Sequence, residues 1–286
     1  MQRVALVTDS SACLLQESLE RYGIRVVSLG LTFKGEVLRD GSLAPAQFFR
    51  RLREARRPPT TTAPAPSDFL AAFRDAQAAG AEQVLCLTLA ANFSSTFGAA
   101  VAAQGLADGE VPGLDVRVAD TGGLAMTHGF AVLAAARAIE AGRGIEEAEA
   151  AALCTARRAG LVGLLDTTLY LARGGRVPWA LHWASAVLHL RPLLGFENGQ
   201  ARGVGRARTQ RGGVERMLRY VQQHASAGAP LHVAVMHADA AERAQELAAA
   251  VRERLQPCEL LITEFTSVMA VHTGPGFLGL AFYSDE

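Results

Sequence analysis

Lysine is almost absent from this sequence of 286 residues. Lys34 is the only lysine among the 28 basic residues, and all the others are arginine. A phosphate-binding loop of the G-x-x-x-x-G-K-[ST] type needs a lysine after its second glycine, and Lys34 lies in no such motif. We therefore predict that the chain does not handle ATP by itself. Charged contacts to an anion would come from arginine, whose planar guanidinium group can donate two parallel hydrogen bonds to a carboxylate or phosphate.

Cysteine and long apolar runs are also scarce. The apolar run 4–7 is too short for a signal peptide, and the stretch 184–196 is interrupted by His189 and Arg191. We therefore predict a cytoplasmic protein with no stable membrane insertion. The cysteines are far apart and form no C-x-x-C pair, which argues against a metal cluster or a disulfide framework: Cys13, Cys86, Cys154 and Cys258.

The sequence has no excess of charge of either sign. Acidic and basic residues number 28 each, so no feature favours nucleic acid as a partner. The glycine-rich fingerprint of dinucleotide-binding folds is missing after the first apolar run, where Thr8-Asp9-Ser10-Ser11 stands instead. We expect no cofactor. Half of the residues are hydrophobic, which is enough for one large or two smaller globular domains.

The first half of the chain alternates strand-like and helix-like segments. Apolar runs at 4–7, 84–87 and 116–119 have strand length, and each leads into a helical pattern. This alternation predicts an α/β domain with a parallel sheet covered by helices. Between each strand and its helix lie hydroxyl or acidic side chains: Thr8-Asp9-Ser10-Ser11, Ser94-Ser95-Thr96 and Asp120-Thr121. The carboxyl ends of parallel strands share one edge, where ligands of such sheets bind, so we expect these turns to form an anion site.

The turn around Ser94 also has a simpler interpretation. Serine and threonine are common N-cap residues, so a hydroxyl before a helix can serve the helix alone. Three hydroxyl turns expected at one sheet edge favour the anion site over a plain cap.

The second half predicts a second α/β domain. Asn198-Gly199 between the strand-like runs 191–196 and 201–208 is a strong hairpin turn, which implies a mixed sheet. We place the N-terminal domain at 1–160 and the C-terminal domain at 161–286. Four local predictions are specific: a single strand over 25–33, a helix capped by Ser67-Asp68, a helix from Asp120 to about Ala141, and a tight loop over 271–276.

Two other functions fit the same residues. A serine hydrolase would use Ser94 or Ser95 as nucleophile and His272 as base, with Asp9 or Asp120 orienting the base. The sequence around Ser94 is not the G-x-S-x-G elbow of that class. A sensor of some other small anion is the remaining alternative.

Several segments together resemble the DegV family of fatty-acid-binding proteins, which includes the fatty-acid-binding subunit of bacterial fatty acid kinase. The similarity spans the whole chain, and the motifs stand in the family's order. They are Val7-Thr8-Asp9-Ser10, the segment 61–69 from Thr61 to Phe69, Phe93-Ser94-Ser95-Thr96-Phe97, Leu165-Asp166-Thr167, Arg173-Gly174-Gly175-Arg176, Arg208-Thr209 and His272-Thr273-Gly274-Pro275-Gly276.

The resemblance implies two α/β domains with one long-chain fatty acid between them. It implies that a separate ATP-binding kinase subunit phosphorylates the carboxylate, so the chain itself is a lipid-binding subunit and not a complete enzyme. The family's carboxylate contacts fall on Thr61, on Ser94 with the amide of Ser95, and on His272. The resemblance also assigns Arg208 to the head group or to the kinase. It adds four further positions to the ligand-binding set: Thr62, Arg176, Thr273 and Gly274.

Two positions depart from the family's pattern. The family usually has glycine where Ser95 stands, and a more polar segment where Thr62-Ala63-Pro64-Ala65-Pro66 stands. Apolar residues are more often part of the core, but six are candidates for lining a tunnel around the acyl tail: Leu164, Leu165, Leu188, Leu190, Leu193 and Phe265.

Overall fold

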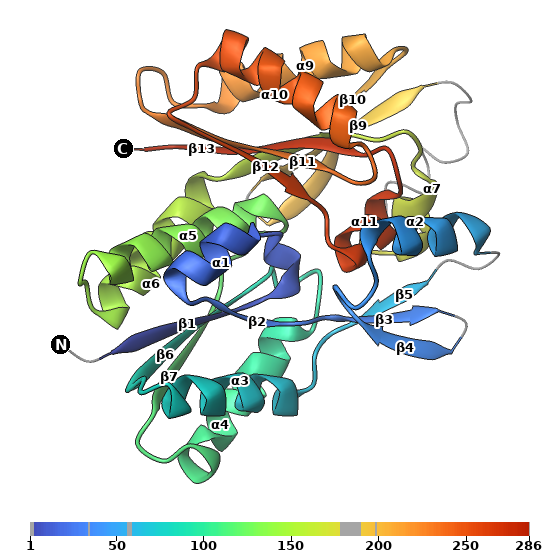
Figure 1. The fold of residues 1–286 in the computed structure, drawn as a ribbon. Helices are drawn as coiled ribbons and strands as arrows, with labels where there is room; N and C mark the ends of the chain where they lie inside the picture. Colours follow the sequence, from blue (N-terminus) through green and yellow to red (C-terminus); the bar gives the residue numbers. More distant parts are fainter. Residues whose placement is uncertain (1–2, 34, 56–58, 178–189, 198, 286) are drawn as a thin grey trace. The chain divides into compact units, whose positions relative to one another are not determined.

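The computed structural model (Figure 1) describes residues 3–33, 35–55, 59–177, 190–197 and 199–285. Its contacts divide the chain into two compact units. The N-terminal unit comprises residues 1–30 and 61–157, and the C-terminal unit comprises residues 31–60 and 158–286. Both are α/β, as the sequence predicts. The sequence-based division into 1–160 and 161–286 differs from this grouping mainly in residues 31–60.

The N-terminal unit is built on a parallel four-stranded sheet in the order β2-β1-β6-β7. The strands are β1 (Val4–Asp9), β2 (Arg25–Val27), β6 (Gln83–Thr88) and β7 (Asp115–Asp120). Every residue of β6 is buried, as expected for a central parallel strand covered on both faces. The predicted parallel sheet is therefore confirmed.

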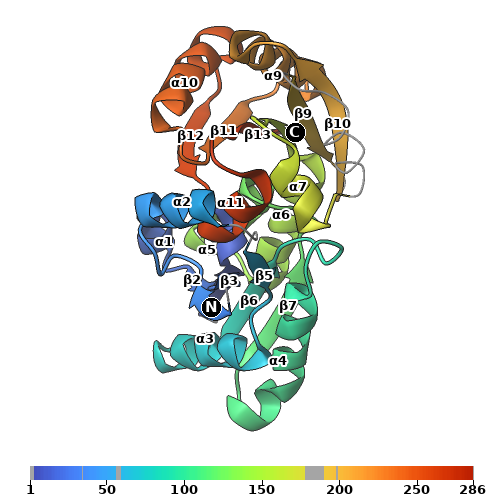
Figure 2. The same ribbon diagram turned by 90° about the vertical axis from the view of Figure 1, so that its right-hand side faces the viewer.

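Helices cover both faces of this sheet (Figures 1 and 2). On one face, Val7, Val84 and Cys86 pack against α3 (Pro66–Ala78) and α4 (Thr96–Glu110). On the other, Leu6 and Leu85 pack against three helices, α1 (Gln16–Tyr22), α5 (Met126–Glu140) and α6 (Ile145–Arg158). The alternation of side chains along each strand divides the core into these two layers.

The C-terminal unit contains a mixed six-stranded sheet in the order β10-β9-β8-β13-β11-β12. Among the described strand pairs of this sheet, β11 and β12 are parallel and the others are antiparallel. The strands are β8 (Gly160–Leu164), β9 (Arg191–Glu197), β10 (Gln200–Ala207), β11 (Leu231–His237), β12 (Glu259–Glu264) and β13 (Leu278–Ser284). The main core lies between this sheet and helices α9 (Gln210–His224) and α10 (Ala241–Leu255). The mixed sheet and the antiparallel β9–β10 pair are as predicted, while Asn198 of the connecting turn lies outside the described residues.

Residues 31–60 make long-range contacts with the rest of the C-terminal unit. This segment contains β4 (Glu36–Arg39), α2 (Pro45–Glu54) and most of β3 (Gly30–Phe33), which pairs with β4 and β5 (Thr60–Thr62). The buried carboxylate of Asp40 accepts a hydrogen bond from the Val268 amide at 3.2 Å. Arg53 forms an ion pair with Asp239 at 2.5 Å.

The four local predictions are wrong in detail. The strand expected over 25–33 is broken into β2 and β3, which belong to different sheets, and Leu29 at the break donates to Ser10 Oγ at 3.1 Å. The helix expected from Asp120 begins at Met126, because the Asp120 carboxylate instead accepts from the Gly122 amide at 2.7 Å.

The helix expected to be capped by Ser67-Asp68 begins at Pro66, with Ala65 as its N-cap. Asp68 still stabilises this helix start, because its carboxylate accepts from the Ala65 amide at 2.9 Å. The loop expected over 271–276 is partly helical, since α11 (Ser267–Thr273) includes His272 in its last turn.

Candidate functional site

The three hydroxyl turns of the N-terminal unit follow the carboxyl ends of three neighbouring strands. β1 ends at Asp9, β6 at Thr88 and β7 at Asp120. These strands are parallel and adjacent, so their carboxyl ends form one edge of the sheet, as predicted. The predicted turns therefore share one edge of a single unit.

Two carboxylates hold the chain segment that leads to Ser94. Asp9 Oδ2 accepts from the Leu89 amide at 2.8 Å, and Asp120 Oδ2 accepts from the Ala91 amide at 3.1 Å. The other oxygen of Asp9 accepts from the amide and the hydroxyl of Ser11 at 3.0 and 2.5 Å. Residues 89–91 are thus fixed from both neighbouring strands, which pre-positions the following hydroxyl turn.

A buried histidine links the same strand ends, and the sequence analysis did not identify it. His128 on α5 is fully buried, and its Nε2 and Nδ1 each lie 3.0 Å from a threonine hydroxyl, Thr8 and Thr121 respectively. Burial lowers the pKa of His128, although the nearby Asp9 opposes this shift. The imidazole is therefore neutral and joins β1 to the segment after β7. The only signal in the sequence is a histidine among the mostly apolar residues of this helix.

Ser94 and Ser95 stand at the start of the 15-residue helix α4. Ser94 Oγ lies 2.8 Å from Thr96 Oγ1 and accepts from the Thr96 amide at 3.3 Å. Ser94 is half-buried and Ser95 is exposed. Ser95 has φ −75° and ψ 9°, which any residue can adopt. Backbone strain therefore does not require glycine at this position.

Thr61 and Thr62 lie on the short strand β5, beside β3. Thr61 is half-buried and Thr62 is exposed. A Cβ atom on Gly30 would collide with the Thr62 hydroxyl, so glycine is what allows the two strands to approach here.

In the C-terminal unit, His272 packs against the end of a second short helix, α7 (Leu169–Gly174). A Cβ atom on Gly174 would lie 2.6 Å from His272 Nδ1. Arg176 folds back and donates to the Gly174 carbonyl at 2.9 Å. Burial lowers the pKa of His272 to about 4, and the positive charge of Arg176 adds to the shift. At neutral pH the imidazole is therefore uncharged and carries one N–H donor.

The chain after His272 depends on two glycines with positive φ. Gly274 has φ +76°, and a Cβ there would collide with the Tyr170 ring. Gly276 has φ +84°, and a Cβ there would collide with the Asp166 carboxylate. Asp166 in turn pairs with Arg191 and with Arg243 Nη1, the latter at 3.3 Å. These contacts explain why glycine stands at both positions of the His-Thr-Gly-Pro-Gly motif.

The structure thus places the predicted site residues in two groups. Thr61, Thr62, Ser94 and Ser95 belong to the N-terminal unit; Arg176, Arg208, His272, Thr273 and Gly274 belong to the C-terminal unit. Within the second group, the positive charge of Arg176 contributes to the lowered pKa of His272. Arg208 is exposed and immediately precedes Thr209, the N-cap of α9.

The geometry of the acidic residues disfavours a catalytic triad. In a triad the orienting carboxylate accepts a hydrogen bond from the histidine ring. Asp9 and Asp120 instead accept from backbone amides of their own unit, and Asp9 also accepts from the Ser11 hydroxyl. Nε2 of the buried His128 lies 3.7 Å from Asp9 Oδ2, which is longer than a hydrogen bond. The hydroxyl of Ser94 pairs with Thr96. These side chains stabilise loops.

Four of the candidate tail-lining residues, including Leu165, are buried core residues. Leu164 and Leu193 are part of the core beside α9 and α10, and Phe265 stacks on Phe277 with ring centroids 4.6 Å apart. Leu188 lies outside the described residues. Among the described residues, no group of three or more His, Cys, Asp or Glu side chains is arranged to hold a metal ion. None of the described helices has both the length and the apolar character needed to cross a membrane.

Comparison with known proteins identifies the family. The sequence model of a family described as uncharacterised DegV proteins matches residues 3–285. The chain belongs to the DegV family. A DegV domain-containing protein of Streptomyces coelicolor is 36% identical over 284 residues, which cover 99% of each chain.

Solved DegV structures share the fold. One is described as showing fatty acid binding of a DegV family protein from Thermus thermophilus; it has a TM-score of 0.88 and 31% identity, and it covers 99% of this chain and 100% of its own. DegV of Bacillus subtilis, described as a fatty acid binding protein, has a TM-score of 0.87 and 25% identity, with all of both chains covered. These neighbours confirm the expected DegV fold of two α/β domains.

Proposed function

We propose that this DegV protein binds one long-chain fatty acid and presents its carboxylate to a separate kinase subunit. The main support for fatty acid binding is the 31% identity, over nearly the whole chain, to a DegV protein described as binding fatty acid. The hydroxyl turn at Ser94 and the neutral, arginine-flanked His272 are the chemical features that support it.

The proposed carboxylate contacts are the hydroxyls of Thr61 and Ser94, the amide of Ser95 and one N–H of His272. A carboxylate removed from water needs several such donors, because an unpaired buried charge is very costly. The start of α4 adds partial positive charge at Ser95. Arg208 contacts either the head group or the kinase in this proposal. Four further residues surround the head group: Thr62, Arg176, Thr273 and Gly274.

An apolar tunnel around the acyl tail supplies the affinity in this proposal. Burial of each methylene is worth roughly 0.8 kcal/mol, so a long tail offers on the order of 10 kcal/mol before the costs of association. The polar contacts then fix the direction in which the chain is bound.

The proposed reaction occurs with the kinase subunit in the cytoplasm. A carboxylate oxygen of the fatty acid attacks the γ-phosphorus of ATP held by that subunit, ADP leaves, and an acyl phosphate forms. This chain would need no cofactor and would catalyse no step alone. The support for this part is the resemblance to the fatty-acid-binding subunit of fatty acid kinase. Incubation with ATP should give acyl phosphate only when a kinase subunit is added.

A comparison of a fatty acid with its methyl ester tests the binding proposal. The ester keeps the tail but lacks the negative carboxylate, so we expect at least about tenfold weaker binding, as for the loss of charged hydrogen bonds. Equal affinities would contradict carboxylate recognition. Release of methanol from the ester, abolished by Ser94→Ala, would instead support the hydrolase. Failure of both lipids to bind would leave the small-anion sensor.

A further inference from the structure

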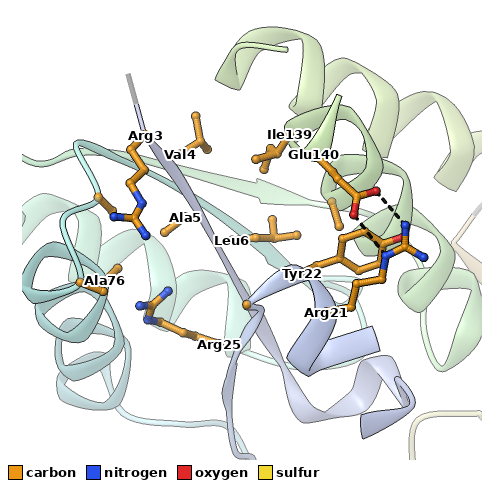
Figure 3. Close-up of a pocket in the computed structure, with 14 residues that line it drawn as sticks. Arg3, Val4, Ala5, Leu6, Arg21, Tyr22, Arg25, Ala76, Ile139 and Glu140 are labelled. Carbon is orange, nitrogen blue, oxygen red and sulfur yellow. Dashed lines mark hydrogen bonds and ion pairs between the residues drawn. The ribbon is translucent and has the colours of Figure 1, made fainter. Parts of the chain in front are cut away.

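A pocket of about 330 Å³ lies in the N-terminal unit, along the edge of β1 (Figure 3). Four consecutive residues, Arg3 to Leu6, line it. Successive side chains of a strand point to opposite faces of the sheet, so four in a row can border one pocket only along the strand's edge. Figure 3 shows Val4 and Leu6 on the side of Ile139, and Ala5 on the side of Ala76.

The strand edge beside this pocket is open. β1 pairs with β6 from Val4 to Thr8, but its pairing with β2 begins only at Val7. In the described part of the chain, no strand pairs with residues 4–6 on the β2 side. The Arg3 carbonyl accepts from the Glu82 and Gln83 amides, toward β6. Because main-chain groups alternate along a strand, those of Val4 and the N–H of Leu6 point toward the open side.

The pocket has free space beside β1. Small side chains stand on both sides, Ala76 and Ala79 next to one face and Ala136 next to the other. Neighbouring strands lie about 4.8 Å apart, so a second chain needs a gap of this kind. Residues 4–6 span about 10 Å, which matches a short extended segment.

Arginine dominates the charge around this edge. Three arginines and one glutamate line the pocket, and the glutamate, Glu140, is engaged by Arg21 at 3.0 and 3.1 Å. Arg25 donates to the Asp75 carbonyl at 3.3 Å. Neither Arg3 nor Arg25 forms an ion pair with any carboxylate in the described residues. Figure 3 shows the guanidinium groups of Arg3 and Arg25 on the same side of β1.

We propose that the open edge of β1 binds an extended, acidic segment of a partner protein by main-chain pairing. The N–H of Leu6 and the main-chain groups of Val4 would add one strand to the sheet, as in other peptide-binding proteins that use a sheet edge. Carboxylates of the segment would pair with Arg3 and Arg25. The unpaired backbone groups favour a peptide over a free anion, because a free anion would leave the Val4 carbonyl without a donor.

The test uses a short peptide that alternates glutamate and valine, added to the full-length protein. We expect binding in nuclear magnetic resonance titrations, with shifts and slowed hydrogen exchange at the amides of Val4 and Leu6. The same peptide N-methylated at every residue has no main-chain N–H donor on either edge, so it cannot pair as a strand and should not bind. Equal binding of the N-methylated peptide, or no change at these amides, would overturn the proposal.

Variants and a free-anion control separate the contributions. Arg3→Glu combined with Arg25→Glu should weaken peptide binding at least about tenfold, while Arg252→Glu on the exposed side of α10 should not change it. Ala79→Leu should block the pocket without a change of charge. Sodium glutamate and phosphate should not reproduce the amide shifts; if they do, the pocket is an adventitious anion site only and the proposal fails.

Discussion

At the scale of single residues, the protonation state of His272 determines how it can contact a carboxylate. The imidazole is neutral at physiological pH because burial and Arg176 lower its pKa to about 4. A neutral imidazole can donate one hydrogen bond to a carboxylate without adding a charge of its own. In this proposal, Arg176 provides the positive charge nearby and His272 provides the directed donor.

Replacement of His272 should therefore weaken fatty acid binding through the loss of this donor. A hydrogen bond to a charged group is worth about 1.5–3 kcal/mol, so His272→Phe should raise Kd roughly ten- to hundredfold. His272→Gln keeps an N–H donor and should recover part of the loss. His224→Phe, on the exposed end of α9, is the matched control. Unchanged affinity of His272→Phe in a fluorescence titration would remove His272 from the site.

The same pKa shift predicts how stability depends on pH. The unfolded imidazole has a pKa near 6.5, so between about pH 6.5 and 4 the unfolded chain binds more protons than the folded chain. The stabilisation is fully present above pH 6.5 and is lost as the pH falls toward 4. Between pH 7 and pH 5, the lowered pKa of His272 should reduce the free energy of unfolding by about 2 kcal/mol. The lowered pKa of buried His128 reduces it further.

Urea unfolding at several pH values measures this effect. His272→Gln should flatten the pH dependence of the unfolding free energy between pH 7 and pH 5, whatever its stability at pH 7. A variant with the same pH dependence as the original protein would show that His272 is not neutral in the fold.

At the scale of elements, the sheet edge of the N-terminal unit is organised by buried and half-buried polar side chains. His128 joins Thr8 of β1 to Thr121, which follows β7, while Asp9 and Asp120 hold residues 89–91. His128→Phe would leave the hydroxyls of Thr8 and Thr121 without this partner. We expect a loss of about 1–3 kcal/mol in unfolding free energy and faster hydrogen exchange at the amides of Leu89 and Ala91. Exchange unchanged at both amides would contradict the positioning role.

Helix α11 depends on a residue far away in the sequence. Asp40 accepts from the Val268 amide at the start of this helix, which carries His272 in its last turn. Asp40→Ala should lower the unfolding free energy by about 1–2 kcal/mol, as for other lost helix caps, and should also weaken fatty acid binding. Asp108→Ala, on α4, is the control for a lost surface charge. Binding that is unaffected by Asp40→Ala would show that α11 holds His272 without this cap.

The sequence predicted the type of most elements but missed several of their boundaries. Apolar periodicity located β1, β6 and β7, because buried parallel strands leave a clear pattern. It could not show that the chain leaves the sheet after Val27, since that break depends on the contact of Leu29 with Ser10. The start of α5 was missed for a similar reason, because the Asp120 side chain bonds to a loop amide.

At the scale of the whole molecule, the sequence indicated the two α/β parts and the parallel and mixed sheets. It did not indicate that residues 31–60 belong with the C-terminal unit, because the contacts of Asp40 and Arg53 join positions about two hundred residues apart. His128 escaped notice because a histidine inside an apolar helix has no distinctive local pattern. The hydroxyl turn at Ser94 was indicated by the sequence pattern itself, whereas Thr61, Arg176 and the carboxylate-binding role of His272 came from the resemblance to the DegV family.

Native mass spectrometry of the gently purified protein tests the central claim, fatty acid binding, most directly. The account predicts a population whose mass exceeds that of the chain by one long-chain fatty acid, and release of that acid on denaturation. The ligand-bound population should fall in a Ser94→Ala, His272→Phe double variant that remains folded. A folded protein without any bound acyl chain, even after incubation with long-chain fatty acids, would contradict the account.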